Sequence, residues 1–492
     1  MVCSPSQAMI HDASPTLIND DLAPTAADER TWSVWNMAAL WIGMVVCVPT
    51  YMLAGGLVDL GMSWWQAVLT VGLGNLVVLV PMVLIGHAGT EYGIPFPVLA
   101  RASFGVLGAN VPALLRGLVA CGWFGIQTWI GGSAIYHLLN ALRGVELGGA
   151  DLPVLGINAA ELGCFLLFWA LQVVIMWRGI ESIKMLETWA APFLILMGLV
   201  LLAWAYVRAD GWGPMLSAPS QFVAGGPKQG QFLSAFFPAL TGMVGFWATL
   251  SLNIPDFTRY ARSQRDQVLG QALGLPFFMM LFAFIGVAVT SATVTIFGEA
   301  IPDPIALLGR MGGGMTVALS LLALSVATFS TNLAANVVSP ANAVVNLSPR
   351  RFSFRLGALV TAGLGVAIFP WKLIESTSGY IFTWLIGYSA LLGPIGGILI
   401  VDYYLVRRTR LDVGALYRRS GPYWYRGGTN PRALVALAVG VAPNVPGFLA
   451  AAGFVESVPA FWGGLYTYAW FVGFVLAGGL YWLLAPRRAQ FR

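Results

Sequence analysis

The sequence predicts an all-α integral membrane protein, and two observations lead to this fold class. Of the 492 residues, 58% are hydrophobic and only 10% are charged, whereas a soluble domain carries about 25% charged residues. In addition, apolar runs of about 20 residues, the length of a helix that crosses a bilayer, recur between Val34 and Leu484. Much of the folded surface must therefore face lipid.

Apolar segments fill most of the chain, and we expect each to be a transmembrane helix. The twelve segments lie near residues 34–57, 64–86, 107–140, 158–177, 188–207, 232–254, 271–297, 313–340, 355–371, 379–404, 432–452 and 460–485. Residues 1–31 lack the basic region, apolar core and cleavage site of a secretory signal, so we expect a cytoplasmic tail, disordered apart from its last few residues. Residues 406–431 form the longest polar loop.

The basic residues are distributed unevenly between the two sides of the membrane. One side carries Arg143, Arg208, Lys228, Arg310 and Lys372. The other side carries many more, because arginines and lysines follow the fourth, sixth, eighth, tenth and twelfth segments. The positive-inside rule then predicts a multi-pass protein of the plasma (inner) membrane with both termini in the cytoplasm. Since this placement accounts for the basic composition, no nucleic-acid partner is expected.

The first and sixth segments are interrupted in corresponding places. The first contains Gly43 and then Pro49, and the sixth contains Gly242, Gly245 and then Pro255. Proline removes a backbone donor, and freed backbone groups inside a membrane must be satisfied by protein or by a water-filled cavity. Paired interruptions indicate a transporter of inverted repeats with a mid-membrane site, although Gly and Pro are also common in ordinary membrane helices. The expected divisions are a tail (1–31), a first five-helix repeat (32–210), a second, inverted repeat (211–405), a cytoplasmic loop (406–431) and the last two spans with a short C-terminus (432–492).

The third segment places an indole ring and a primary amide on one helical face. Trp123 and Gln127 are four residues apart in CGWFGIQTWIGG, residues 121–132, and so lie one turn apart on the same side. The indole offers a flat stacking surface, and the amide offers one acceptor and two donor hydrogens. Together they suit a small flat ligand with an amide edge, such as a pyrimidine, hydantoin or ureide. The alternative is that Gln127 only bonds a neighbouring helix.

The eighth segment carries oxygen atoms suited to a hard monovalent cation. Ala327 lies three residues before Ser330 and four before Thr331, so one face offers a carbonyl and two hydroxyls. Carbonyls of an unwound helix commonly complete such a site in transporters. Asn336 lies further along the same helix, where it could reach a substrate amide. The alternative is that the hydroxyls bond carbonyls of their own helix.

The carboxylates favour sodium over protons as the coupling ion. We expect Asp256 to pair with Arg259, to gate the cytoplasmic end or to cap a helix, and Asp402 to pair with the arginines that follow it. No carboxylate stands in the middle of a segment, so a buried proton relay is not evident.

An enzyme and a resident cofactor are not expected. The chain has three histidines and four cysteines, with no HExxH motif and no CxxC pair. It also lacks paired carboxylates in mid-segment and nucleophile motifs. A membrane receptor that binds its ligand without transporting it is a further alternative.

Over nearly its full length the chain resembles the type-one nucleobase–cation symporters, which include permeases for uracil, cytosine, allantoin, thiamine and hydantoins. The resemblance is carried by ERTW at 29–32, HAGTEYGIPFPVLARASFG at 87–105, CGWFGIQTW at 121–129, SLNIPDFTRYAR at 251–262, STNLAANVVSP at 330–340 and GPIGGILIVDYYLVRR at 393–408. It implies the LeuT-type fold of two inverted five-helix repeats plus two helices. It also implies alternating access, with substrate and cation bound together.

The resemblance also implies roles for individual residues. Trp123 and Trp247 would stack on the substrate ring, Gln127 would read its amide edge, and Asn336 would add a polar contact. A sodium ion would bind the carbonyls of Gly43, Val46 and Ala327 and the hydroxyls of Ser330 and Thr331. Many relatives use protons, so the coupling ion stays open.

Two positions of this sequence depart from the hydantoin member of the family. Cys47 stands where that protein has a polar amide, and Phe246 stands where it has a glycine beside the second tryptophan. The larger side chain should shrink the substrate site, so we expect a small unsubstituted ring, uracil first. Thymine, dihydrouracil, simple hydantoin and allantoin are alternatives, cytosine is less favoured, and an amino-acid carrier of the same fold is a more distant alternative.

Overall fold

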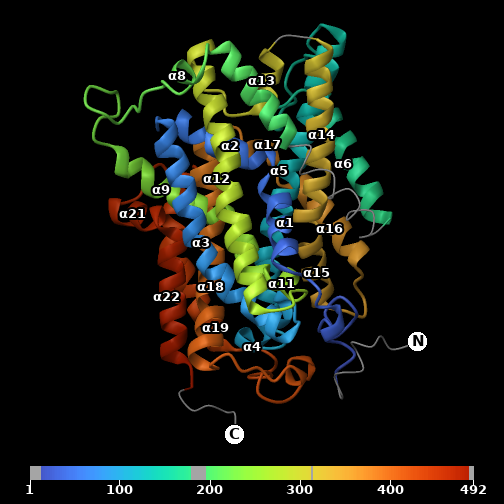
Figure 1. Ribbon diagram of the computed structural model, residues 1–492. Helices are drawn as coiled ribbons and strands as arrows, with labels where there is room; N and C mark the ends of the chain where they lie inside the picture. Colours follow the sequence, from blue (N-terminus) through green and yellow to red (C-terminus); the bar gives the residue numbers. More distant parts are fainter. Residues whose placement is uncertain (1–12, 179–194, 312–313, 487–492) are drawn as a thin grey trace.

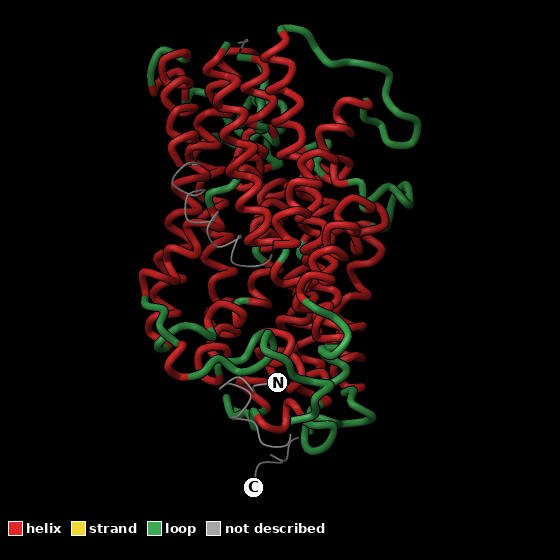
Figure 2. Tube along the Cα trace, turned by 90° about the vertical axis from the view of Figure 1, so that its right-hand side faces the viewer, coloured by secondary structure: helices red, strands yellow, loops and turns green. Residues whose placement is uncertain are grey.

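The computed structural model describes residues 13–178, 195–311 and 314–486. Within helix α14 (Met315–Asn336) it describes the backbone but not the side chains at 315, 316, 319, 323, 326, 327, 330 and 334. The described chain folds into one elongated helical bundle (Figures 1 and 2). Its first and last described segments lie at the same end of that bundle (Figure 1).

Each of the twelve predicted segments is mostly helical where the structure describes it; residues 188–194 of the fifth lie outside the described chain. The helices of these segments are α1 (Val34–Val45) with α2 (Val48–Asp59), α3 (Trp64–Tyr92), α5 (Asn110–Arg143), α6 (Ala159–Arg178), the helix Ile195–Arg208, α9 (Phe232–Phe246) with α10 (Ala248–Asn253), α12 (Gln264–Phe297), α14, α16 (Phe354–Ala367), the π-helices η3 (Gly379–Leu385) and η4 (Val401–Val406) with α18 (Ile386–Ile400) between them, α19 (Pro431–Val441) with α20 (Val445–Ala451), and α21 (Ala460–Thr467) with α22 (Ala469–Leu484).

Shorter helices connect these segments. They are η2 (Ala27–Glu29), α4 (Phe96–Phe104), α8 (Trp212–Met215), α11 (Pro255–Thr258), α13 (Pro304–Arg310), α15 (Val338–Leu347), α17 (Pro370–Leu373), η5 (Gly414–Tyr417) and η6 (Ala442–Asn444). Of these, α4 lies between the second and third predicted spans, where no helix was expected. Its sequence FPVLARASF is buried throughout, so apolar packing holds it although it is too short to cross a bilayer.

The two predicted interruptions are breaks in the helices. Span one is bent by 61° between α1 and α2, where Val46 and Cys47 leave helical geometry and Pro49 occupies the first turn of α2. Span six breaks at Trp247, between α9 and α10, and Pro255 instead begins α11. Proline fits the first turn of a helix, where its missing N–H has no partner to lose. The second break therefore lies eight residues before the proline that predicted it.

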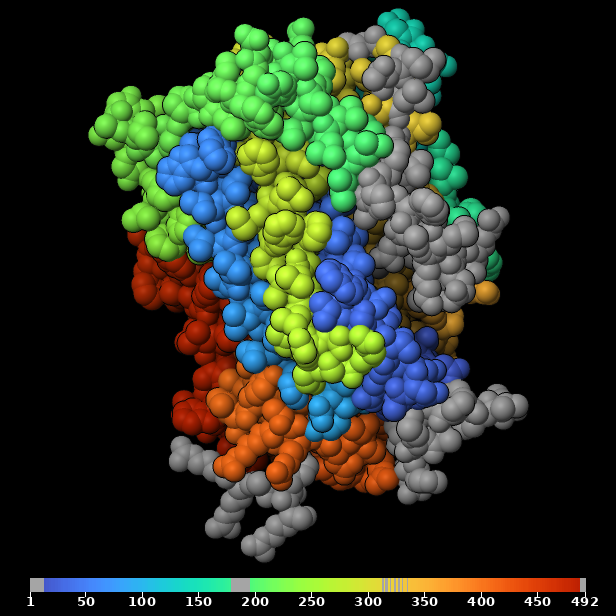
Figure 3. Space-filling model, viewed as in Figure 1, coloured from blue at the N-terminus to red at the C-terminus, as the bar shows by residue number. Residues whose placement is uncertain are grey.

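The helices around these breaks pack in two sets. In one set, which we call the α12 set, α12 packs against α1, α2 and α3, and α12 lies between α3 and α1 on the face shown in Figure 3. In the other, the α5 set, α5 packs against α6, α14, α15 and α16. The short helix α10 of span six contacts both α3 and α5, so it stands at the boundary of the two sets.

The tail is ordered from residue 13 onward, so the expectation of disorder is wrong for residues 13–28. Leu17 and Leu22 are buried. The Ser14 N–H donates to the Tyr417 carbonyl at 2.8 Å, and the Tyr417 hydroxyl donates to the Leu22 carbonyl at 2.6 Å. Burial of the two leucines against the loop 406–431 stabilises this segment, and a polar composition alone did not reveal it.

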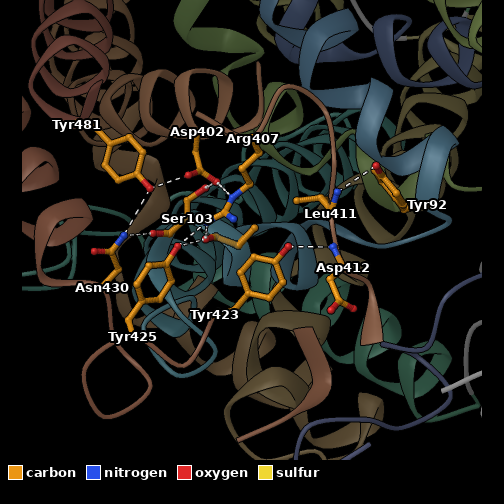
Figure 4. A network of polar contacts seen from close by, with 11 residues as sticks. Tyr92, Ser103, Asp402, Arg407, Leu411, Asp412, Tyr423, Tyr425, Asn430 and Tyr481 are labelled. Atoms are coloured by element: carbon orange, nitrogen blue, oxygen red, sulfur yellow. Dashed lines mark hydrogen bonds and ion pairs between the residues drawn. The ribbon is translucent and has the colours of Figure 1, made fainter. Parts of the chain in front are cut away.

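The loop 406–431 is held by a buried polar network (Figure 4). Arg407 donates from Nε to Asp402 at 2.6 Å and from Nη2 to the Ala102 carbonyl at 2.6 Å. Asp402 also accepts from Ser103 at 3.1 Å and from Tyr481 at 2.7 Å. The predicted pairing of Asp402 with a following arginine is confirmed, and the pair joins α4, η4 and α22.

Candidate functional site

A small cavity lies where the broken spans one and six face the α5 set. It is lined by Met44, Cys47, Trp123, Gln127, Phe246, Trp247, Thr249, Leu250, Ala335 and Asn336. The structure thus brings together all six residues that the sequence reading assigned to the substrate. They come from four separate spans, and the breaks place their side chains here because the chain changes direction at Val46–Cys47 and at Trp247.

Three aromatic rings form part of the wall of this cavity. Phe246 lies edge-on to Trp123, with ring centroids 5.2 Å apart, and edge-on to Trp247, with centroids 4.9 Å apart. Phe246 therefore contacts both rings that were expected to stack on a substrate. The cavity measures about 30 Å³, which is room for a water molecule rather than for a six-membered ring. A flat ligand could stack on both indoles only after Phe246 or one of the spans moves.

The sequence reading missed a second layer of aromatic residues behind Trp123. The Trp123 ring contacts Tyr380, Trp384 and Tyr388, with centroids 6.0 to 6.3 Å apart. These residues belong to η3 and α18, and the Tyr388 hydroxyl donates to the Gly245 carbonyl of span six at 2.8 Å. They fix the orientation of Trp123 by edge-to-face packing. The order of aromatic residues within one segment does not predict which rings of other spans they will contact.

Gln127 is a buried amide with an unused acceptor. The side chain is 5% exposed, and its Oε1 atom has no hydrogen-bond partner among the described residues. A buried polar group without a partner costs about 1–3 kcal/mol. In the described chain no donor from a neighbouring helix bonds Oε1, which the predicted alternative would require of this atom. The arrangement leaves this oxygen able to accept a hydrogen bond from a ligand N–H.

The second amide of the cavity, Asn336, is held by a network of polar side chains. Its Nδ2 donates to Asn332 Oδ1 at 3.0 Å. Asn332 in turn donates to Thr128 Oγ1 at 3.2 Å and to Gln172 Oε1 at 2.8 Å, and Gln172 donates to Thr128 at 3.0 Å. This network joins α5, α6 and α14. It positions Asn336. No spacing within one segment indicates this network, because three different helices contribute to it.

The backbone at the end of α1 frees the carbonyls that were predicted to bind a cation. The Cys47 N–H donates to the Val45 carbonyl at 3.0 Å, and the Thr50 N–H donates to the Cys47 carbonyl at 3.2 Å. In a continuous helix these donors would bond the carbonyls of Gly43 and Val46. Helix α1 packs against α14, which carries Thr331 as a buried residue. The side chains of Ala327 and Ser330 lie outside what the structure describes.

Asp256 is half-buried and caps a helix other than its own. It accepts a hydrogen bond from the backbone N–H of Phe96, the first residue of α4, at 2.8 Å, and one from Asn253 Nδ2 at 3.3 Å. Of the three predicted roles the structure favours capping, since Arg259 donates to the Asp21 carbonyl and to Tyr260 instead. In the described parts of the chain, no group of three or more His, Cys, Asp or Glu side chains could hold a metal ion.

Comparisons with known proteins show which family this chain belongs to. The family profile described as "Permease for cytosine/purines, uracil, thiamine, allantoin" matches residues 24–473. The chain is 52% identical to the purine-uracil permease NCS1 of Arabidopsis thaliana over 475 residues, covering 96% of this chain and 78% of that one. It is 41% identical to the allantoin permease of Bacillus subtilis over 479 residues, covering 96% and 94%.

Among solved structures, the chain is similar to the transporter Mhp1. The inward-facing conformation of Mhp1 superposes with a TM-score of 0.77 and 28% identity, over 96% of this chain and 94% of that one. The closed conformation with bromovinylhydantoin bound gives a TM-score of 0.75, over 95% and 94%. The chain therefore belongs to the type-one nucleobase–cation symporter family, and it is a multi-pass membrane transporter with the LeuT-type fold and not an enzyme.

Proposed function

We propose that this protein imports a small flat amide ring, uracil first, by sodium symport. The observation that carries the proposal is the buried, unpartnered Oε1 of Gln127, which lines the same cavity as Trp123 and Trp247. An imide N–H of a pyrimidine would supply the missing donor. The ring itself would stack on the indoles, where flat apolar faces are favoured over water. Asn336, Cys47 and Phe246 complete the proposed contacts.

Phe246 is the basis for choosing a small ring. It lies between the two indoles, so a substituent on the ligand would collide with it. The relative with 52% identity is a purine-uracil permease, which supports uracil. Allantoin is the second candidate, since the relative with 41% identity is an allantoin permease and two amides suit a ureide. A hydantoin is the third, because a relative with 30% identity is the hydantoin permease of Microbacterium maritypicum.

An amino-acid substrate fits the cavity less well. The ammonium and carboxylate of an amino acid need charged or strongly polar partners when they leave water. None of the described residues that line the cavity is charged.

Sodium is the proposed coupling ion, bound by the carbonyls of Gly43, Val46 and Ala327 and the hydroxyls of Ser330 and Thr331. The support is the broken end of α1, whose carbonyls leave the helical ladder, and its packing on α14. Cation binding there would order the break beside the substrate cavity. Linkage then requires each ligand to tighten the binding of the other by the same factor.

Transport would proceed by alternating access in the plasma membrane, with both termini in the cytoplasm. The proposed unit boundaries are those of two inverted repeats, residues 32–210 and 211–405, and the α12 set would rock against the α5 set around the cavity.

Reporter fusions at each terminus test the topology; an alkaline phosphatase fusion that is active at either end would contradict it.

Quenching of tryptophan fluorescence in purified protein is the first test of the substrate. Uracil, allantoin and hydantoin are titrated in turn, each with and without sodium. Saturable quenching by uracil that tightens with sodium is expected. Quenching by allantoin or hydantoin alone would move the substrate, and binding that is indifferent to sodium would argue for protons. Flux into liposomes then separates a transporter from a receptor.

A further inference from the structure

Arg116 is a buried cation inside a membrane-spanning helix. It lies on α5, seven residues and two turns before Trp123, on the same helical face, and it is 2% exposed. Charged side chains within spans are expensive, and those that face the bundle interior commonly mark substrate or ion pathways. Arg116 is not among the residues that line the cavity, so its role differs from that of Trp123 and Gln127.

The hydrogen bonds of Arg116 cross the boundary between the α5 set and span six. Its Nη2 donates to Asn253 Oδ1 at 2.8 Å, and its Nε donates to the Thr249 carbonyl at 3.5 Å. Both acceptors belong to α10, the short helix that follows the break at Trp247. Thr249 itself lines the cavity. Arg116 therefore holds the wall of the cavity from behind, on the side of the α5 N-terminus.

Asp256 fixes the orientation of the Asn253 amide. Asn253 donates from Nδ2 to Asp256 Oδ2 at 3.3 Å, which leaves its carbonyl oxygen for Arg116. Asp256 is itself held by the N–H of Phe96 at the start of α4. The contacts form one chain from α4 through α11 and α10 to α5. Separation of α10 from α5 would have to break it at the Arg116 bonds, since Asn253 and Asp256 lie on the same side of the boundary.

The Arg116 guanidinium is incompletely bonded, in contrast to that of Arg407. Nη1 of Arg116 has no hydrogen-bond partner among the described residues, and its Nε bond is long. Arg407 has bonds of 2.6 Å from both Nε and Nη2 and stacks over Tyr423. Among the described residues Arg101, another buried guanidinium, likewise has no partner for its Nε. What distinguishes Arg116 is therefore the place of its bonds, across the boundary between the α5 set and span six, where a contact has to break when the two separate.

We propose that Arg116 is a positioning residue that closes the cavity on the side of the α5 N-terminus, and that its bonds to α10 break whenever the cavity opens to that side. The proposal rests on the proposed use of this cavity for substrate. In this proposal the cavity is closed on that side while Arg116 of span three is hydrogen-bonded to Asn253 of span six. Asp256 holds Asn253 in place for this contact.

Native Cys47 provides a test that needs no substrate. It lines the cavity and is 4% exposed. With Cys3, Cys121 and Cys164 replaced by alanine, full-length protein is placed in liposomes of known orientation. A charged, membrane-impermeant methanethiosulfonate is then added to one side at a time, and the rate of Cys47 modification is measured. Arg116→Met should raise the rate about fivefold or more from the α5 N-terminal side only.

Two further variants keep the test decisive if Arg116→Met folds poorly. Asn253→Ala removes the Nη2 acceptor and should raise the rate in the same way. Arg116→Lys keeps the charge and a donor and should restore a rate close to that of the parent protein. Arg101→Met is the matched control, because Arg101 is 1% exposed but bonds Leu416 and Asn346 instead of α10, and it should leave the rate unchanged.

The proposal is overturned if both Arg116→Met and Asn253→Ala react at the parent rate. It is also overturned if the increase appears from the opposite side, or if Arg101→Met gives the same increase, since general loosening would then explain it. Because no ligand is present, these outcomes are independent of the fluorescence titration. A wrong substrate would alter the quenching result and leave the labelling result unchanged.

Discussion

At the scale of single residues, the two amides of the cavity are in different states. Asn336 donates to Asn332 and is held by the network behind it, whereas the Gln127 acceptor has no partner in the described part of the chain. A group held by its neighbours is preorganised, and a group with an unused acceptor gains a hydrogen bond when a ligand arrives. Gln127 should therefore contribute more to ligand affinity than its burial alone suggests.

Replacing Gln127 with alanine should weaken substrate binding by about 1 kcal/mol or more, a factor of about five. The reason is that the ligand N–H would then be buried without an acceptor. The measurement is the dissociation constant of uracil, or of allantoin if that is the ligand, from tryptophan quenching. Gln231→Ala, at an exposed loop position, is the control. An unchanged constant in Gln127→Ala would remove Gln127 from the site.

Replacing Phe246 with glycine should widen the ligand range. Phe246 contacts both indoles, so its removal opens space between them. The affinity for bromovinylhydantoin should rise relative to that for uracil, and thermal stability should fall, since removal of a buried aromatic side chain typically costs about 3–5 kcal/mol. Phe246→Leu keeps most of the volume and should change the preference little. If the two variants show the same preference, Phe246 does not select by size.

Features of the site that lie within one helix could be predicted from the sequence, and contacts between several helices could not. Trp123 and Gln127 follow from one helical period, whereas Trp247 and Cys47 were expected from the family resemblance. The Asn332–Thr128–Gln172 network and Arg116 were not predicted. Their contacts depend on which faces of α5, α6, α10 and α14 meet, and no spacing within one segment encodes that.

At the scale of helices, too, local properties were predicted and contacts between helices were not. The twelve apolar segments were predicted correctly because length and hydropathy decide whether a helix can cross a bilayer. The position of the second break was predicted less well. Pro255 begins α11, and the chain leaves α9 at Trp247. Two residues earlier the Gly245 carbonyl accepts a hydrogen bond from Tyr388 of α18, a contact that no local rule describes. The buried helix α4 and the ordered tail were missed for the same reason.

The end of α1 and the middle of α14 give the prediction that belongs to this scale. The double change Ser330→Ala and Thr331→Ala should abolish the sodium dependence of substrate binding, because the proposed cation site would lose both of its hydroxyls and keep only its carbonyls. The substrate dissociation constant is measured with and without sodium. Ser325→Ala is the control, since its hydroxyl bonds the Leu321 carbonyl of its own helix. Retained sodium stimulation in the double variant would rule out this cation site.

At the scale of the whole molecule, the last two spans are joined to the rest by packing and by hydrogen bonds around a buried ion pair, Asp402–Arg407. Helix α22 packs along α18 and α19, and Tyr481 of α22 donates to Asp402. Asn430, just before α19, donates to the Ser103 carbonyl at 2.6 Å. Figure 4 shows these side chains converging on Asp402 and Arg407 from distant parts of the chain. The side chains of the pair are 1% and 8% exposed.

Arg407→Leu should destabilise the protein strongly, because it leaves the Asp402 carboxylate buried without its cation. Breaking a buried pair in this way costs about 3–5 kcal/mol, whereas removing both charges together costs much less. The midpoint of thermal unfolding in detergent should therefore fall in Arg407→Leu and recover in part when Asp402→Asn is added. Arg262→Leu is the control, since Arg262 pairs with Asp266 at the surface, where it is 56% exposed, and such pairs contribute about 0–1 kcal/mol. If the double variant is no more stable than Arg407→Leu, the penalty comes from lost packing against Tyr423 and not from an unpaired charge.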